Sequence, residues 1–158
     1  MKTLIRTLLW LALIVWFGAL LFFPITAWAS FSTVADTHVA GTIVRKCLVV
    51  LHHEGLFAGG LIVVLLAVGY LTRTFRMSTV SIGVVVTLLM LGCTAWSQFG
   101  IMPRMEKDRI AAGGAIDSVP KTDPRHVDFD RLHNVSTDVE EAVMLGGLVL
   151  VILVARDF

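Results

Sequence analysis

Two short clusters of ionisable side chains lie directly before apolar stretches of this sequence. They are His52, His53 and Glu54 in the first case and Asp138, Glu140 and Glu141 in the second. Imidazole rings ligate haem iron or carry protons, and carboxylates bind protons or cations. Ionisable groups inside a membrane are costly and usually functional. If the apolar stretches cross a bilayer, these six residues are therefore the candidates for chemistry.

The composition places those stretches in a membrane. The chain has 158 residues, of which 56% are hydrophobic and 16% are charged, whereas a soluble domain carries about 25% charged residues. A soluble enzyme and a disordered regulator are therefore excluded. The formal net charge of +1 also excludes nucleic acid as a partner, because phosphate backbones attract a marked basic excess. Two cysteines, Cys47 and Cys93, are too few for a disulfide framework or a zinc motif.

Four apolar stretches are long enough to cross a bilayer, which takes about 20 helical residues. They cover residues 8–28, 47–71, 80–102 and 136–155. Each is expected to be a helix, because every backbone polar group in lipid must be satisfied within its own segment. The predicted fold class is an all-α integral membrane protein, a single domain over 1–158 with four transmembrane helices packed up and down. Residues 103–132 form its external loop, in which 105–112 extends the third helix until a glycine pair at 113–114 stops it.

Basic residues set the orientation, because loops rich in lysine and arginine stay in the cytoplasm. Those that flank the spans on one side are Lys2, Arg6, Arg73, Arg76 and Arg156. Both termini are therefore predicted in the cytoplasm and the loop outside, in a bacterial inner membrane. Residues 27–29 resemble a signal-peptide cleavage site, but the preceding apolar run is longer than a usual signal core of about 7–15 residues. We expect the first helix to be retained, with Pro24 kinking or ending it.

Helical spacing brings polar residues of three spans to one level in the outer half of the membrane. Those outside the fourth helix are His52, His53 and Glu54 of the second span and Ser97 and Gln98 of the third. The fourth helix carries two polar stripes, because residues three or four positions apart share a face. The first comprises His133, Ser136, Thr137, Glu140 and Gly147, and the second comprises Asp138 and Glu141.

Only one of these two stripes can face the bundle. We expect the stripe of His133 to do so, because Gly147 on the same side lets another helix approach closely. Glu140 should then hydrogen-bond Gln98, Ser97, His52 or His53, since an unpaired buried carboxylate is costly. The second stripe should face water or a basic residue of another subunit. A purely structural alternative places the histidines among lipid headgroups and the acids in a first helical turn, where the helix dipole favours them.

Short motifs relate the chain to a known family. They are Trp16-Phe17-Gly18 and Phe22-Phe23-Pro24 in the first helix, Pro103-Arg104 at the end of the third, and Phe129-Asp130-Arg131-Leu132-His133-Asn134-Val135-Ser136 before the fourth. This pattern resembles the family of unknown function numbered 4149, bacterial relatives of the eukaryotic transmembrane protein 205. The resemblance implies four spans and no settled activity. The acidic run over 138–141 departs from the family, whose members look more apolar there.

Three functions fit this sequence; we assign no catalytic residue, and no metal site apart from the histidines named below. The first is a non-catalytic accessory or structural subunit of a larger, energy-transducing membrane complex, because P-loop, Gly-x-Ser-x-Gly and His-Glu-x-x-His motifs are missing. The second is a binder of haem b or a metal, with His53 and His133 as axial ligands and His52 as the substitute. The third is a small transporter or resistance factor with Glu140 and Glu141 on a proton or cation path. The expected partners are the lipid bilayer and other membrane subunits.

Overall fold

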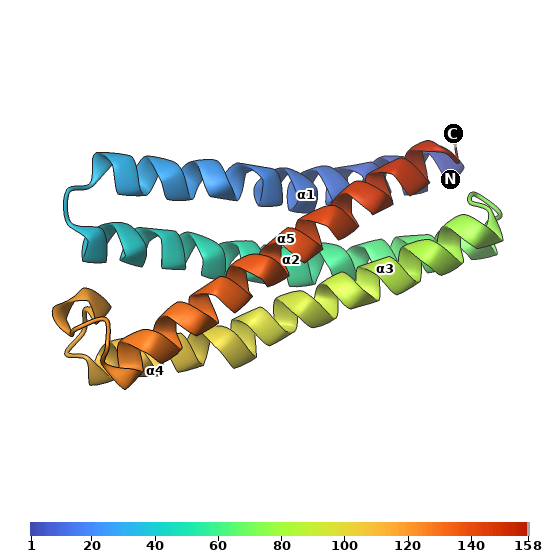
Figure 1. The fold of residues 1–158 in the computed structure, drawn as a ribbon. Coiled ribbons are helices and arrows are strands. Elements are labelled where there is room, and N and C mark those ends of the chain that lie inside the picture. The colour runs from blue at the N-terminus through green and yellow to red at the C-terminus, as the bar shows by residue number, and fades with distance from the viewer. Residues whose placement is uncertain (158) are drawn as a thin grey trace.

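The computed structural model describes residues 1–157, and every regular element in that range is a helix. The elements are α1 (Lys2–Thr33), α2 (Thr37–Leu71), α3 (Met77–Trp96), the π-helical turn η1 (Ser97–Ile101), α4 (Met102–Ala111), the 3-10 turn η2 (Ile116–Ser118) and α5 (Pro124–Ala155). Because α3, η1 and α4 follow one another without a break, the chain forms four long helical segments (Figure 1). The prediction of an all-α fold with four helical segments is confirmed.

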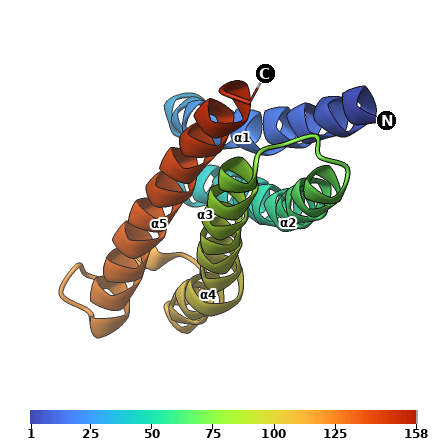
Figure 2. The same ribbon diagram turned by 90° about the vertical axis from the view of Figure 1, so that its right-hand side faces the viewer.

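The four segments run up and down, so both chain termini lie at one end of the bundle, beside the turn between α2 and α3 (Figure 1). We call this the terminal end. The opposite end, which holds the α1–α2 turn and residues 112–123, is the loop end. α5 crosses the bundle diagonally beside α3, from α4 at the loop end to α1 at the terminal end (Figures 1 and 2). The two halves of α5 therefore have different neighbours.

Three of the segments are long and apolar enough to cross a membrane: α1, α2 and the continuous run that begins with α3. Large apolar side chains such as Leu21, Phe57 and Leu89 are exposed along them, whereas soluble monomers rarely expose extended apolar patches. The chain is therefore a helical membrane protein. α5 is as long as α1, but the acids at 138, 140 and 141 keep it out of this group.

Aromatic side chains of α1 fill sockets made by glycines on the neighbouring helices. Trp16 is only 2% exposed, and its indole occupies the space where side chains at Gly55 and Gly59 of α2 would stand. Phe17 takes the same kind of space at Gly147 of α5. The close approach expected at Gly147 is therefore made by a ring of α1.

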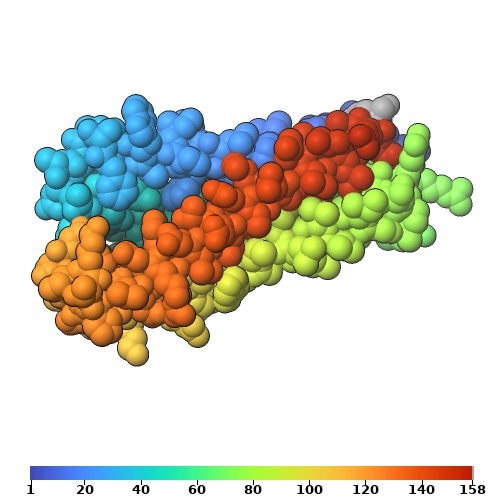
Figure 3. Space-filling view, viewed as in Figure 1, coloured from blue at the N-terminus to red at the C-terminus, as the bar shows by residue number. Residues whose placement is uncertain are grey.

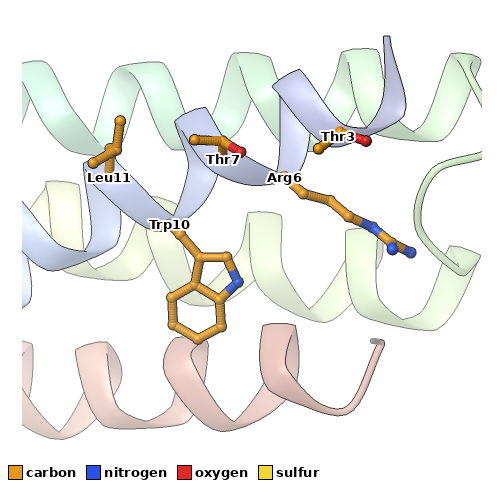
Figure 4. Close-up of a pocket in the computed structure, with 5 residues that line it drawn as sticks. All are labelled: Thr3, Arg6, Thr7, Trp10 and Leu11. Atoms are coloured by element: carbon orange, nitrogen blue, oxygen red, sulfur yellow. The ribbon is translucent and has the colours of Figure 1, made fainter.

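Hydrogen bonds join the three chain segments that meet at the terminal end. Arg6 of α1 donates from Nη2 to the backbone oxygens of Thr74 and Asp157, both at 3.3 Å. The Asp157 carboxylate in turn accepts from the backbone N–H of Arg76, at 2.9 Å, just before α3 begins. A shallow pocket of about 330 Å³ lies beside Arg6, and the ring of Trp10 points from there toward α5 (Figure 4). Polar contacts thus hold this end of the apolar bundle together.

Two prolines lie within helices that extend beyond the predicted spans. Pro24 lies inside α1, which continues to Thr33, so it does not end the first helix. Pro124 lies in the first turn of α5, where a missing N–H leaves no helical hydrogen bond unmade. α5 therefore begins well before residue 136, where the predicted fourth span starts.

The irregular segment before α5 is a short part of the region 103–132 that is predicted to lie outside the membrane. α4 ends at Ala111, and Gly113 and Gly114 follow with φ angles of 86° and 103°, a region of backbone conformation that suits glycine. The predicted glycine stop is confirmed. Only residues 112–123, which include η2, separate α4 from α5.

Candidate functional site

A buried histidine joins three of the four helical segments in the loop half of the bundle. His52 of α2 is 1% exposed. Its Nδ1 lies 2.8 Å from Oε1 of Gln98 in η1, and its Nε2 lies 2.6 Å from Oε1 of Glu140 in α5. The Glu140 side chain is 14% exposed. We call these three residues the histidine network.

The π turn η1 brings Gln98 into the network. Pro103 has no N–H, and in a regular α-helix its ring would clash with the carbonyl group four residues earlier. The helix widens just before this proline, so that the Met102 N–H donates to Ser97 O, five residues back. Ser97 is fully buried in this turn, and Gln98 lies within hydrogen-bond distance of His52.

Donor and acceptor rules limit where the protons of the network lie. Gln98 Oε1 only accepts, so Nδ1 of His52 carries a hydrogen and donates to it. The contact between Nε2 and Glu140 then holds one further proton, either on the ring or on the carboxyl group. Both placements give a pair without net charge and keep both ring nitrogens bonded. The buried ring needs these partners, because a buried polar group without one costs about 1–3 kcal/mol.

Small polar and apolar side chains of η1 and α5 pack beside the network. The Oγ atoms of Ser97 and Ser136 lie 3.5 Å apart and link these two elements. Ile101, Leu132 and Val139 form a small buried cluster there, separate from the main apolar core. The network therefore lies among closely packed side chains.

An ion pair joins α2 to α4, two helical turns nearer the loop end than the histidine network. Arg45 lies seven residues before His52, on the same side of α2, and its Nη1 lies 3.0 Å from Oε2 of Glu106. Glu106 also accepts from Arg109 at 2.6 and 3.0 Å. The hydrogen bonds from Arg109, and then the charge of Arg45, lower the pKa of Glu106 from its usual 4.5. The sequence reasoning missed this bridge, although the seven-residue spacing on α2 was an available signal.

Comparison with known protein families shows to which family the chain belongs. Residues 11–110 match the family described as "Domain of unknown function (DUF4149)". The chain belongs to this family. The match includes the motifs at 16–18 and 103–104, whereas the motif at 129–136 lies beyond it, and the relation to transmembrane protein 205 stays a prediction. No curated protein and no solved structure matches the chain.

The predicted polar residues of this DUF4149 protein lie in different environments. Glu140 contacts His52, one of the hydrogen bonds expected for it, and Gln98 bonds the other nitrogen of the same ring. His53 is exposed, and its Nδ1 lies 2.7 Å from the backbone oxygen of Val49. The sequence therefore pointed to all three members of the network, but not to which adjacent histidine faces inward.

α5 is rotated relative to the expected orientation. Ser136 and Gly147 of the stripe expected to face inward are buried, but His133 and Thr137 are exposed, so the prediction is wrong for these two residues. The centre of the buried side lies between Ser136 and Val139, because burying an apolar side chain is favourable and burying a polar one without partners is not. Glu140 lies at the edge of this buried side and is therefore partly exposed.

The remaining predicted acids of the DUF4149 protein lie outside the network. Asp138 and Glu141 are exposed on α5. Glu54 is half-buried and lines a shallow pocket of about 340 Å³ between α1 and α2, together with Lys46. The four acids of the predicted polar level thus divide into one that reaches His52 and three that do not.

The histidines do not fit the expected haem site. Bis-histidine ligation needs two imidazoles whose free nitrogens face the iron from opposite sides. Both nitrogens of His52 already contact Gln98 and Glu140, while His53 and His133 are exposed. Within residues 1–157, no group of three or more His, Cys, Asp or Glu side chains is arranged to hold a metal ion. We therefore derive no function from haem.

Proposed function

We propose that this DUF4149 protein is a non-catalytic subunit of a larger membrane assembly, and that the loop half of α5 binds the partner. The observation that carries this proposal is a pair of exposed carboxylates, Asp138 and Glu141, on that half of α5. Neither has a hydrogen-bond or ion-pair partner among residues 1–157. The loop half of α5 lies on the outside of the molecule, uncovered by other segments (Figure 3).

The depth of these carboxylates supports a partner if α5 is a fourth span. The apolar part of α5, residues 142–155, covers about 21 Å at 1.5 Å per residue, whereas the hydrocarbon core is about 30 Å thick. A crossing by α5 therefore brings Asp138 and Glu141 into the membrane edge. Such a group costs about 2.5–3.5 kcal/mol at the middle of a span and less toward its edge. A partner helix with basic or hydrogen-bond-donating side chains would remove this cost.

The same proposal includes the orientation of the protein. Arg6, Arg73, Arg76 and Arg156 all belong to segments at the terminal end, so the positive-inside rule favours that end as the cytoplasmic one in a bacterial inner membrane. At the loop end, basic and acidic residues are equal in number over residues 103–132, so this region carries no excess of positive charge. Retention of α1 also belongs to the proposal, because Trp16 would otherwise leave its sockets on α2.

The test is whether neutralising the two carboxylates releases the chain from its assembly. The tagged full chain is extracted from its own membranes in mild detergent, and the mass of the particle is measured for the wild type and for the double variant Asp138→Asn/Glu141→Gln. We expect the wild type to form a particle larger than one chain. The double variant should lose the partner while keeping its unfolding temperature, because neither side chain makes a hydrogen bond or ion pair within the described residues.

The control is Asp130→Asn, which removes an exposed carboxylate of the same helix nearer the loop end; unlike the other two, Asp130 lies 3.7 Å from Nε2 of His126. It should retain the partner, because Asp130 lies before the stretch that would enter the membrane. A wild-type chain that runs alone contradicts the subunit proposal. A double variant that keeps its partner, or an equal loss in the control, contradicts the assignment of the surface.

A further inference from the structure

We propose that the histidine network is a binding site for one proton, which it takes up and releases in the loop half of the bundle without losing a hydrogen bond. The inference goes beyond the subunit function and does not depend on it. It rests on the position of His52 between Gln98 and Glu140, at 2.8 and 2.6 Å from its two ring nitrogens.

With the proton bound, the network has no net charge. The Nδ1–H of His52 donates to Gln98 Oε1, and one proton lies between Nε2 and the carboxyl group of Glu140. Both ring nitrogens are bonded, which matters because the imidazole is 1% exposed and has no access to water as a substitute partner.

Release of the proton gives a second complete set of hydrogen bonds. The Nε2–H of His52 now donates to the Glu140 carboxylate, while the bare Nδ1 accepts from Gln98. For this, the amide of Gln98 turns by about 180° and presents its NH₂ group in place of its oxygen. One proton leaves to water, and the charge of the network changes from zero to one negative charge. Glutamine suits this position because it can donate or accept at the same place.

The proton exchanges through Glu140, because this is the more exposed of the two residues that share it. Its side chain is 14% exposed, whereas His52 is 1% exposed. Toward the terminal end, the ring of Trp16 fills the space at Gly55 and Gly59 of α2, and the main apolar core follows. The site therefore opens on one side and is not part of a continuous path through the bundle.

The other ionisable residues near this level lie on α2, α3, α4 and α5. They are Arg45, Lys46, Cys47, His53 and Glu54 on α2, Cys93 on α3, Glu106 on α4, and His133, Asp138 and Glu141 on α5. α3 and η1 contain no charged residue or histidine, and α1 carries only Lys2 and Arg6, at the terminal end. Among the described residues, Glu140 is thus the one carboxylate that contacts His52.

The test follows the imidazole nitrogens of the isotopically labelled full chain in detergent micelles by NMR, between about pH 4 and pH 9. The His52 signals are those that disappear in His52→Gln. We expect one titration at His52, above whose midpoint Nε2 carries the hydrogen and Nδ1 is bare. A folded wild type in which His52 does not titrate, or keeps its hydrogen on Nδ1 throughout, overturns the proposal.

A variant pair separates this site from general charge effects. Glu140→Gln preserves hydrogen bonding but cannot hold the negative charge, so we expect proton binding at His52 to weaken at least about tenfold, a fall of about one pH unit in the midpoint. Glu141→Gln removes the exposed neighbouring carboxylate and should leave the midpoint unchanged. An unchanged midpoint in Glu140→Gln, or equal shifts in both variants, overturns the proposal. If Glu140→Gln does not fold, the wild-type titration alone decides.

Discussion

A methyl group at Gly55 would test the packing of Trp16 against α2. A Cβ atom there would lie 2.4 Å from Nε1 and 2.9 Å from Cε2 of Trp16, inside normal van der Waals contact. Trp16 is 2% exposed, so its ring has little room to move aside. Gly60, five residues along the same helix, has nothing within 4 Å of the equivalent position. Gly55→Ala and Gly60→Ala therefore form a matched pair, because only the first places its new methyl group in steric conflict with Trp16.

The expected difference in unfolding temperature between the two variants follows from two opposing effects. Alanine stabilises a helix interior by about 0.5–1 kcal/mol relative to glycine, and this gain should be similar at both positions. Overpacking a filled core costs about 1–3 kcal/mol, and only Gly55→Ala suffers it. At about 2–4 °C per kcal/mol for a chain of this size, Gly55→Ala should unfold about 2–12 °C below Gly60→Ala.

The assay is thermal unfolding of the full chain in mild detergent, followed by circular dichroism. A second arm combines Gly55→Ala with Trp16→Phe. Phenylalanine lacks the pyrrole ring that carries Nε1, so the cost of the new methyl group should be smaller in that background, a non-additivity typical of residues in contact. Equal unfolding temperatures for Gly55→Ala and Gly60→Ala, or strict additivity with Trp16→Phe, would refute the packing argument.

Two further predictions concern the loop end and the orientation. Because Arg109 and Arg45 lower the pKa of Glu106, its stabilising contribution should be complete above its unperturbed pKa of 4.5 and lost as the pH falls through the lower folded value. Unfolding temperatures should therefore show a gap between wild type and Glu106→Gln at neutral pH that closes in acid, and a gap independent of pH would contradict this. A reporter enzyme active only in the periplasm should be inactive when fused to the C-terminus and active when inserted at 113–114, and the reverse pattern would contradict the proposed orientation.

Several features of the fold followed from the sequence because they depend on local properties. The length and composition of the apolar stretches indicated helices that cross a membrane, and Gly113 with Gly114 indicated the end of α4. The level of His52, Gln98 and Glu140 also followed, since each residue advances a helix by about 1.5 Å whatever surrounds it. The start of α5 at Pro124 did not follow, because the apolar pattern marks only the part of the helix that can lie in lipid, here from residue 136.

The direction in which each side chain points was decided only by the tertiary structure. One step along a helix turns a side chain by about 100°, and the pattern put His53 ahead of His52, whereas His52 is the one that is buried. The packing of Trp16 against Gly55 and Gly59 fixes the rotation of α2 and turns His52 inward.

The same holds for α5 and for η1. Burial of Val139 and Ser136 rotates α5 so that His133 faces outward while Glu140 still reaches His52. The π turn before Pro103 sets the direction of Gln98. The position of a residue along a helix depends only on its own segment. The direction in which its side chain points depends on how the whole helix packs against its neighbours, and these neighbours come from parts of the chain that are distant in sequence.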